Sequence, residues 1–433
     1  MVYYSTHKKV GNVSLQDAVM KGLADDKGLF MPNNINVLSP AFFETIETLS
    51  LQEIAYIVAD AFFGEDVDAH SLKRIVYDTL DFEIPLVKVA QNCYSLELYH
   101  GPTMAFKDVG ARFMSRLLAH FIQQNRKKQV KVLVATSGDT GSAVANGFFG
   151  VEGIHVYVLY PKGLVSAIQE AQFTTLGQNI TALEVDGTFD DCQRLVKSAF
   201  MDEELNKRFN LTSANSINVA RFLPQAFYYF YAYAQLKKIG KAHNIVVSVP
   251  SGNFGNLTAG LFAKRMGLPI KRFIAANNRN DIFLNYLQTG KYEPRTSIPT
   301  IANAMDVGDP SNFERILALY EDSHTAICRD ISGFAYEDHQ IKHAIKSCLN
   351  ETNYLLDPHG ACAYQALKDG LNEDEVGIFL ETAHPAKFKE TVEKITDQEL
   401  PLPTQLQAFM RGKKRTIPIS SDFETLKTFL KTL

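Results

Sequence analysis

The sequence predicts an α/β protein with doubly wound, mostly parallel sheets. From residue 84 onward, short apolar stretches alternate with longer segments of helical periodicity, which is the pattern of strands connected by helices. The stretch 245–249 is almost entirely apolar, as expected for a strand that is buried on both faces of a parallel sheet. Glycine-rich loops at 137–141 and 251–256 each follow such a stretch and precede a helical segment.

The N-terminal part of the chain, residues 1–82, predicts a mainly helical region. Residues 13–22 fit one short helix, and Ile54 and Val58 mark the apolar face of another. The stretch 28–32, Gly-Leu-Phe-Met-Pro, is expected to form a buried bend.

The rest of the chain predicts the sheets and their connecting helices. Apolar stretches predict strands at 130–134, 155–160, 180–185, 245–249 and 377–380. Apolar residues at helical spacing predict helices at 142–149, 165–176, 192–200 and 257–266. The more polar segment 281–349 is expected to form a helical insertion beside the core.

The composition excludes several classes of protein. Hydrophobic residues make up 46% of the 433 residues, charged residues 21%, and the net charge is −4, so nucleic acid is not an expected partner. Five scattered cysteines without a paired spacing argue against a zinc site or disulfides and for a reducing compartment. Because no apolar stretch can cross a bilayer and the first ten residues lack a signal-peptide core, we expect a cytoplasmic protein without membrane contact.

One lysine, Lys107, follows a stretch of mostly small and apolar residues, 99–106, that contains a Gly-Pro turn. Val109, Phe113 and Leu117 then recur at helical spacing, so Lys107 is expected at or just before a helix N-terminus. Burial and the positive end of the helix dipole both favour the uncharged amine, which is the form that attacks an aldehyde. Considered alone, a lysine at a helix start is more often solvated.

The loop 251–256, Ser-Gly-Asn-Phe-Gly-Asn, has the chemistry of an anion site. Its two glycines, Gly252 and Gly255, let backbone N–H groups turn toward a bound phosphate, and the following helix adds the attraction of its dipole. Asn253 and Asn256 supply neutral donors. The loop lacks the lysine of a Walker motif and the third glycine of a dinucleotide fingerprint, so taken alone it also fits a purely structural turn.

Two further polar segments are candidate anion sites. In the loop 137–141, N–H groups and hydroxyls are suited to a carboxylate, whereas Asp139 is expected to fix the loop; a plain turn capped at Ser142 fits this loop equally well. Asn215, Ser216 and Arg221 form a second possible grip on a phosphate or carboxylate. The alternative there is a helix cap with a surface arginine.

The segment 381–388 follows the last predicted strand. Thr382 stands at the strand end, where its hydroxyl can bond a ring nitrogen. His384 is more typical of a histidine that packs in a loop than of a catalyst.

Taken together, these segments resemble the threonine synthase family of fold-type-II pyridoxal-phosphate enzymes. The resemblance rests on residues 100–108 (His-Gly-Pro-Thr-Met-Ala-Phe-Lys-Asp), 137–141, 251–256, 302–312 and 382–385. The bend at 28–32 also looks like this family, so the resemblance covers the chain from near residue 1 to about residue 390.

The resemblance implies a cofactor, pyridoxal 5′-phosphate, and a role for each candidate residue. Lys107 is expected to be catalytic and to hold the cofactor covalently. The expected ligands of the cofactor phosphate are Gly252, Asn253, Phe254, Gly255 and Asn256. Thr382 is expected to bond the pyridine nitrogen. The expected ligands of the substrate carboxylate are Ser137, Gly138, Asp139 and Thr140, and those of the substrate phosphate are Asn215, Ser216 and Arg221.

The resemblance also implies a reaction and a domain organisation. The expected enzyme is a carbon–oxygen lyase that converts O-phospho-L-homoserine and water into L-threonine and phosphate, the last step of threonine biosynthesis. We expect residues 83–110 and 225–433 to form a large cofactor domain, and residues 111–224 to form a smaller mobile domain that closes over the substrate.

Other expectations follow from what the chain lacks. Because there is no long plant-type N-terminal extension, activation by S-adenosylmethionine is not expected. No metal site is expected, and a monomer or a homodimer is expected. The basic stretch 411–415 is interpreted as a solvated surface run.

Two alternatives remain from the sequence. The same loops could serve a fold-type-II dehydratase of threonine or serine, which has no need of Arg221. A related protein that has become a binding or regulatory module is the second alternative; the presence of Lys107 together with both glycine loops favours catalysis instead.

Overall fold

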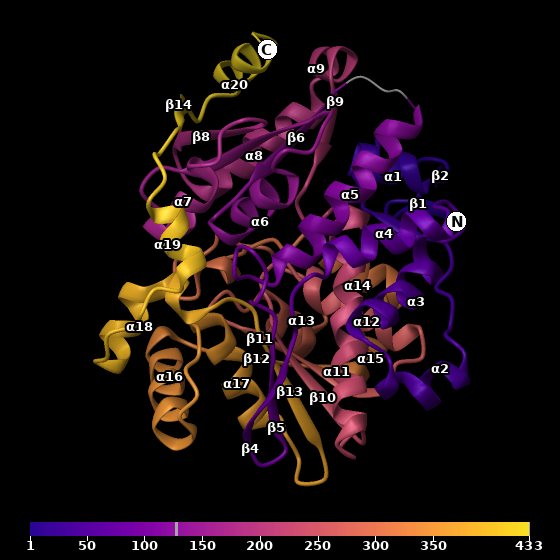
Figure 1. The fold of residues 1–433 in the computed structure, drawn as a ribbon, viewed down its shortest axis with the longest axis vertical. Helices are drawn as coiled ribbons and strands as arrows, with labels where there is room; N and C mark the ends of the chain where they lie inside the picture. Colours follow the sequence, from indigo (N-terminus) through magenta and orange to yellow (C-terminus); the bar gives the residue numbers. More distant parts are fainter. Residues whose placement is uncertain (126–128, 433) are drawn as a thin grey trace. The chain divides into compact units, whose positions relative to one another are not determined.

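The computed structural model describes residues 1–125 and 129–432. The chain divides into two compact units, which we call unit 1 (Met1–Asn33, Lys107–Arg221 and Leu402–Leu433) and unit 2 (Asn34–Phe106 and Phe222–Pro401). The chain passes from unit 2 to unit 1 between Phe106 and Lys107. Figure 1 shows the elements of both.

Unit 2 is built on a six-stranded sheet in the order β12-β11-β10-β13-β5-β4. Its strands are β4 (Leu86–Ala90), β5 (Cys93–Glu97), β10 (Ile245–Pro250), β11 (Ile270–Asn277), β12 (Ile331–Ala335) and β13 (Val376–Glu381). All neighbouring pairs are parallel except β4 and β5 at one edge. Parallel strands place their carboxyl ends at one edge of a sheet, which is where α/β proteins bind ligands.

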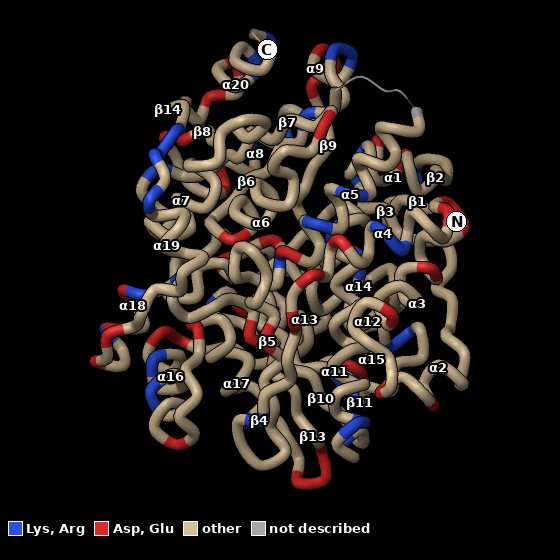
Figure 2. Tube along the Cα trace, in the orientation of Figure 1, with Lys and Arg blue, Asp and Glu red and all other residues tan. Residues whose placement is uncertain are grey.

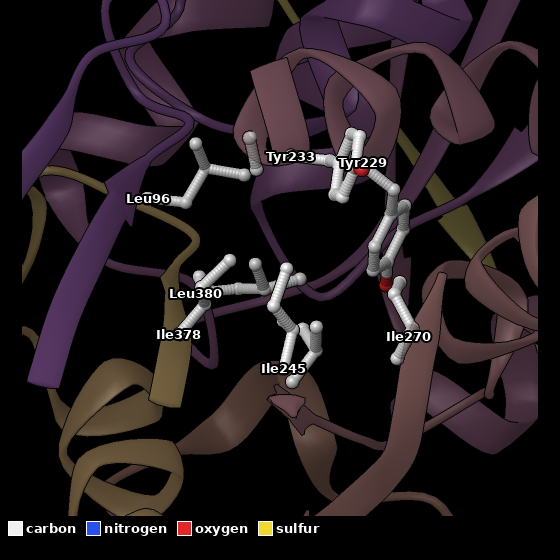
Figure 3. Close-up of a pocket in the computed structure, with 9 residues that line it drawn as sticks. Leu96, Tyr229, Tyr233, Ile245, Ile270, Ile378 and Leu380 are labelled. Atoms are coloured by element: carbon white, nitrogen blue, oxygen red, sulfur yellow. The ribbon is translucent and has the colours of Figure 1, made fainter. Parts of the chain in front are cut away.

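Helices cover both faces of this sheet, which explains why its strands are apolar without alternation. On one face, Ile245, Ile378 and Leu380 point toward Tyr229 and Tyr233 of α11 (Ala226–Lys238), as Figure 3 shows. The cavity among these side chains measures about 10 Å³, at the lower limit for one water, so it is no substrate site.

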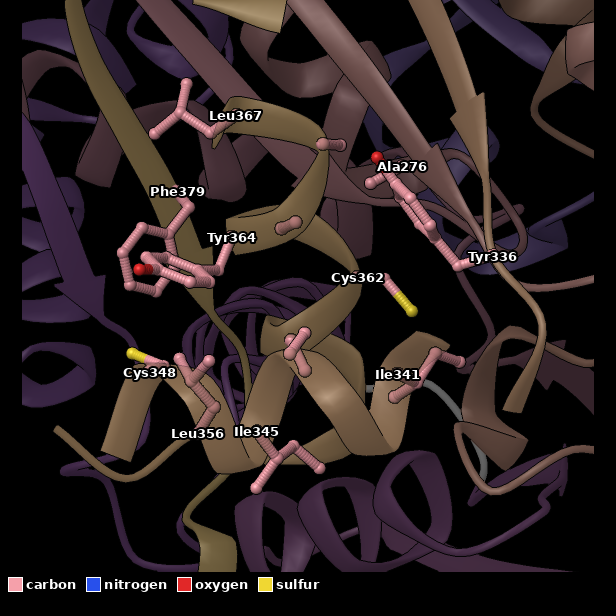
Figure 4. Close-up of a cluster of buried hydrophobic side chains, with 14 of the residues drawn as sticks. Ala276, Tyr336, Ile341, Ile345, Cys348, Leu356, Cys362, Tyr364, Leu367 and Phe379 are labelled. Atoms are coloured by element: carbon pink, nitrogen blue, oxygen red, sulfur yellow. The ribbon is translucent and has the colours of Figure 1, made fainter. Parts of the chain in front are cut away.

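The intervening residues of the same strands face the opposite side. Phe379, for example, packs into a cluster with Tyr364 and Leu367 of α17 (Pro358–Gly370) and with Ile341 and Ile345 of α16 (Asp338–Thr352), drawn in Figure 4. Because α17 contacts β10, β11 and β13, it is firmly held against the middle of the sheet.

The other helices of unit 2 surround this core. They are α2 (Pro40–Thr45), α3 (Leu51–Phe63), α4 (Ala69–Thr79), α12 (Gly255–Arg265), α13 (Ile282–Thr289), α14 (Phe313–Leu319), α15 (His324–Asp330), α18 (Lys389–Thr396) and the 3₁₀ helices η1 (Ile46–Thr48), η2 (Leu223–Gln225), η3 (Asn303–Met305) and η4 (Pro385–Phe388). The segment 281–349 was predicted to be a helical insertion. It also supplies β12, which pairs in parallel with β11 and extends the sheet, so that interpretation is corrected.

Unit 1 is built on a five-stranded, fully parallel sheet in the order β14-β8-β7-β6-β9. Its strands are β6 (Val130–Ala135), β7 (Ile154–Pro161), β8 (Ile180–Asp186), β9 (Asn210–Ser213) and β14 (Ile417–Ser420). Its helices are α1 (Leu15–Lys21), α5 (Lys107–Asn125), α6 (Asp139–Phe148), α7 (Ala167–Thr174), α8 (Phe189–Met201), α9 (Glu203–Arg208), α19 (Thr404–Met410) and α20 (Phe423–Lys431). The short helix α10 (Val219–Phe222) ends at the unit boundary.

The N-terminal region is not wholly helical, which corrects the prediction for residues 1–82. It begins with a small antiparallel sheet, β2-β1-β3, of β1 (Val2–Ser5), β2 (Val13–Ser14) and β3 (Phe30–Pro32). The predicted bend at 28–32 therefore contains a buried strand. Residues up to Asn33 belong to unit 1, because α1 packs on β9 and α5.

The C-terminal segment also differs from the predicted division, which placed it in the large domain. Residues Leu402–Leu433 belong to unit 1, because β14 pairs with β8 and α20 packs on α8. The basic stretch 411–415, blue between α19 and β14 in Figure 2, takes part in this attachment. Lys414 lies 2.7 Å from Glu170 and 2.9 Å from Glu184, so the stretch is not merely solvated.

The five strands predicted between residues 130 and 380 are confirmed as β6, β7, β8, β10 and β13, and the four helices as α6, α7, α8 and α12. The helix predicted at 142–149 begins earlier, at Asp139. Among the described helices, none combines the length and apolarity that crossing a membrane requires.

Candidate active site

The glycine loop of unit 2 connects the carboxyl end of β10 to the N-terminus of α12. Phe254 has a φ of 60°, a left-handed conformation that lets the chain turn directly into the helix. A Cβ at Gly252 would lie 2.7 Å from the Cα of Met305, so only glycine permits the close approach of η3 to this loop.

Asn253 fastens the loop to a neighbouring turn. Its Oδ1 accepts a hydrogen bond of 2.7 Å from the N–H of Ser311, and its carbonyl accepts one of 3.0 Å from Asn312 Nδ2. The hydroxyl of Ser251 donates back to the carbonyl of Val249, 2.8 Å away. These side chains therefore shape the loop through bonds that the sequence did not indicate.

Asn256, in the first turn of α12, offers a donor to an anion. Its Oδ1 accepts hydrogen bonds from the hydroxyls of Tyr228 (2.6 Å) and Tyr229 (2.7 Å). These two bonds orient the side-chain amide so that Nδ2 points away from the two tyrosines. Burial raises the pKa of both tyrosines well above the usual range, so they remain donors. Within the described residues, the buried Nδ2 of Asn256 has no hydrogen-bond partner.

An orphaned buried donor is costly unless a ligand satisfies it. Asn256 Nδ2 lies at the N-terminus of a helix, beside glycines, and the loop contains no acidic residue that would repel an anion. The residues present therefore fit the phosphate of pyridoxal phosphate.

Thr382 follows β13 and lies beside the chain that leads to Lys107. Its carbonyl accepts a 2.9 Å bond from the N–H of Phe106, and Ala105 pairs with Ala383 in an isolated bridge. His384 caps η4 by accepting a 3.1 Å bond from the Ala386 N–H at Nδ1. Burial and the nearby charge of His100 lower the pKa of His384 to about 4, so the ring is neutral.

Lys107 is the first residue of α5 in unit 1, as predicted. Arg221 is attached to the same turn: its Nη1 donates to the Lys107 carbonyl at 3.0 Å, and its Nε donates to the Ala214 carbonyl at 2.7 Å. The side chain is 3% exposed, which excludes the surface arginine considered from the sequence. Burial lowers the pKa of Arg221 to about 10 against the opposing effect of Asp108, so the guanidinium stays charged.

The loop 137–141 of unit 1 is fixed from within. The Thr136 hydroxyl accepts bonds from the N–H groups of Gly138 (2.9 Å) and Gly141 (2.7 Å), a role that the sequence did not reveal. Asp139 accepts a 2.9 Å bond from Gln169 Nε2, which agrees with the expectation that it fixes the loop. Gly138 has a φ of 141°, and a Cβ there would collide with Gln169.

Asn215 connects the two predicted substrate segments of unit 1. Its Nδ2 donates to the carbonyl of Ala135 at 3.1 Å, at the end of β6 and just before the loop 137–141. Ser216 follows it, partly exposed. In unit 1, hydrogen bonds to the backbone thus connect Arg221 to Lys107 and Asn215 to the strand end before the 137–141 loop. The glycine loop and Thr382 belong to unit 2.

Sequence reasoning missed a buried polar chain in unit 2. Asp357 caps the N-terminus of α17, bonds His359, and donates its own N–H to Glu381, at the end of β13, at 2.6 Å. Burial and the Asp357 carboxylate raise the pKa of Glu381 well above the usual range. The available signal was Asp-Pro-His-Gly, an N-cap residue followed by proline at the first helical position.

Comparison with known proteins agrees with this geometry. A family model described as "Pyridoxal-phosphate dependent enzyme" matches residues 85–381. Models of the threonine synthase N terminus and C-terminal part match residues 2–80 and 360–430.

Whole chains are similar as well. Threonine synthase of Haemophilus influenzae is 45% identical, and that of Escherichia coli 44%, each over 99% of both chains. The crystal structure of the Escherichia coli protein superposes with a TM-score of 0.94 at 41% identity, covering 100% of both chains. A pyridoxal-phosphate-bound threonine synthase from Brucella melitensis gives a TM-score of 0.93 at 34% identity, covering 100% of this chain and 99% of that one. The chain therefore belongs to the threonine synthase family of pyridoxal-phosphate-dependent enzymes.

Proposed function

We propose that the protein converts O-phospho-L-homoserine and water into L-threonine and phosphate, acting in the cytoplasm as a monomer or homodimer. The observation that supports this substrate most directly is the buried, charged Arg221 bonded to the backbone of Lys107. A substrate phosphate is an ester dianion, and a guanidinium held in place binds such a group through paired hydrogen bonds.

Pyridoxal phosphate, when bound, supplies a conjugated ring that delocalises negative charge on the substrate carbons. Gly252, Asn253, Phe254, Gly255 and Asn256 would hold its phosphate through loop N–H groups and the Asn256 amide. Thr382 would bond its ring nitrogen through a neutral hydroxyl.

Lys107 would hold the cofactor covalently through Nζ and then act as the proton carrier. Its amine would carry one proton at a time: it would take the proton from Cα and pass it on, and then take one from Cβ as the bond from Cγ to the phosphate oxygen breaks. It would next return a proton at Cγ, which shifts the double bond to Cα–Cβ; water would then add its hydroxyl at Cβ and give its other proton to the released phosphate, and a last proton returned at Cα would complete threonine. The positive end of α5 favours the uncharged amine that this work requires.

The remaining groups would orient the substrate. Ser137, Gly138, Asp139 and Thr140 would hold its carboxylate, with Asp139 fixing the loop through Gln169, and Asn215, Ser216 and Arg221 would hold its phosphate. The segment 111–224, predicted as the smaller mobile domain, lies mostly in unit 1. Unit 1 as a whole would therefore be the part that closes over the substrate and excludes water.

The test is an assay of the purified full chain with pyridoxal phosphate and O-phospho-L-homoserine. We expect phosphate and threonine in equal amounts, and an Arg221→Ala variant with a raised KM for O-phospho-L-homoserine. Deamination of threonine or serine without phosphate release from phosphohomoserine would identify a dehydratase. A protein without cofactor absorbance near about 410–420 nm would be a binding module instead.

A further inference from the structure

One histidine outside the residues discussed above as ligands reaches the segment that backs the glycine loop. His359 lies in the first turn of α17 and is 3% exposed. Its Nε2 accepts a hydrogen bond of 3.1 Å from the backbone N–H of Ala304, in the middle of η3. Its Nδ1 lies 2.5 Å from Oδ1 of Asp357.

These two bonds determine which nitrogen of His359 carries the proton. A backbone N–H can only donate, so Nε2 must be the unprotonated acceptor. The proton of the neutral ring is therefore on Nδ1 and points at the Asp357 carboxylate. Asp357 fixes both the tautomer and the orientation of the ring, as carboxylates do behind metal-bound histidines.

Asp357 is itself held from several sides. It accepts bonds from the N–H groups of His359 (2.8 Å) and Gly360 (3.2 Å), as the N-cap of α17, and its N–H donates to Glu381. A Cβ at Gly360 would lie 1.5 Å from Glu381 Oε2, so glycine is needed for this approach. Because the body of α17 packs into the cluster of Figure 4, His359 projects from a rigid element.

The 3₁₀ helix η3, which His359 bonds at Ala304, packs against the glycine loop. A Cβ at Gly252 would lie 2.7 Å from Met305 Cα and 3.0 Å from the Ala304 carbonyl oxygen. The backbone of η3 is thus in van der Waals contact with the loop, and a shift of Ala304 must either open a gap there or displace Gly252.

We propose that His359 is a positioning residue for cofactor binding: by holding Ala304, it sets η3 against Gly252 and keeps the glycine loop in its phosphate-binding shape. The proposal rests on the assignment of this loop to the cofactor phosphate. It predicts that loss of the Ala304 bond weakens the grip on the phosphate and not the grip on the pyridine ring.

Two amide variants separate the two bonds of His359. Gln at position 359 can place an oxygen near the Nε2 position and accept from Ala304, whereas the shorter Asn reaches only the Nδ1 position near Asp357. The dissociation constants of pyridoxal phosphate and of pyridoxal, which lacks the phosphate, are measured by equilibrium dialysis with the cofactor-free full chain. We expect His359→Asn to weaken pyridoxal phosphate binding about 10-fold and pyridoxal binding by less than about 2-fold, and His359→Gln to retain most of the affinity.

Equal weakening of both ligands by His359→Asn, or equal behaviour of the Asn and Gln variants, would overturn the proposal. If His359→Asn does not fold, Ala304→Pro removes the N–H that His359 accepts and leaves the residues of the glycine loop unchanged. An unchanged ratio of the two dissociation constants in that variant also overturns the proposal. A wild-type protein that binds pyridoxal as tightly as pyridoxal phosphate would instead show that the glycine loop is not the phosphate site, which is a failure of the assignment itself.

Discussion

The guanidinium of Arg221 donates through Nη1 to the backbone carbonyl of Lys107, 3.0 Å away. A residue predicted to bind the substrate is therefore hydrogen-bonded to the backbone of the residue predicted to carry the cofactor, although the two lie on different helices, α10 and α5. Gly110, one turn along α5, makes this possible, since a Cβ there would lie 2.3 Å from the Arg221 carbonyl oxygen.

Gly110→Ala should displace Arg221 from the N-terminal turn of α5. The methyl group cannot be accommodated unless the backbone moves. Because a misplaced binding group loses affinity for the substrate, we expect the KM for O-phospho-L-homoserine to rise about 10-fold or more. Steady-state kinetics measures the effect. Gly11→Ala is the matched control, because a Cβ at Gly11 has no atom within 4 Å; equal KM values for the two variants would contradict this role of Gly110.

Asn256→Asp keeps the shape of the side chain but replaces the orphaned Nδ2 donor by an oxygen. A carboxylate at the N-terminal turn of α12 would repel the cofactor phosphate, so we expect the affinity for pyridoxal phosphate to fall by about 10-fold or more. Equilibrium dialysis measures it, with pyridoxal as the control ligand. Unchanged affinity for pyridoxal phosphate would mean that Asn256 does not contact the phosphate.

A partly buried ion pair connects Arg272, near the start of β11, to Glu375, just before β13. Arg272 donates to both oxygens of Glu375, at 3.2 Å and 2.6 Å. Burial would raise the pKa of Glu375, but the bonds from Arg272, Asn372 and Lys271 outweigh it and lower the pKa to about 2. Glu375→Gln leaves Arg272 without its charge partner, and we expect a loss of about 3 kcal/mol in the free energy of unfolding.

Chemical denaturation at neutral pH measures this loss, with the exposed Glu373→Gln as control. Because the folded pKa of Glu375 is depressed, its contribution is present above the ordinary carboxyl pKa and disappears as the pH falls toward 2. The two variants should differ less in their free energy of unfolding at pH 2.5 than at pH 7. The same difference at both pH values would be inconsistent with an ion pair.

Asp306 should lower the free energy of unfolding as the pH rises, whereas the contribution of Glu375 is lost as the pH falls. Burial raises its pKa to about 6, although Thr300 and Asn278 donate to its carboxylate. A raised folded pKa means that its contribution is fully present below the unfolded value near 3.8 and is lost as the pH rises through 6. Relative to wild type, Asp306→Asn should therefore gain about 2 kcal/mol of unfolding free energy between pH 4 and pH 7. Denaturant unfolding at both pH values measures the gain, and parallel pH profiles would refute the shift.

The sequence predicted the parallel sheets because burial on both faces leaves a local signature. Strands such as β10 and β13 are apolar at successive positions, since Ile245 and Ile378 pack under α11 while Phe379 packs under α17. Strands β4, β5, β9, β11, β12 and β14 of the two main sheets were not predicted; β12 and β14 show one reason. Each is short and partly exposed, and each is defined by a pairing partner far away in the sequence, β11 and β8, which no local pattern encodes.

The candidate site was predictable where glycine, small polar residues and a helix start coincide, as at Lys107 and in the loop 251–256. The supporting bonds were not. Gln169 bonds Asp139 and Asp357 bonds Glu381 across 30 and 24 residues of sequence. Thr136 bonds the adjacent loop, but it does so through backbone N–H groups that no residue pattern marks. Nothing local distinguishes a histidine that holds Ala304 from one that fills space.

The central claim is that Lys107 Nζ carries the cofactor, and one measurement tests it most directly. The holoenzyme is reduced with borohydride, digested, and its peptides are mapped by mass spectrometry, with a Lys107→Ala variant treated in parallel. We predict a phosphopyridoxyl group on the peptide that contains Lys107 and none on the variant. A label on another lysine, or no label on the wild-type protein, would contradict the account.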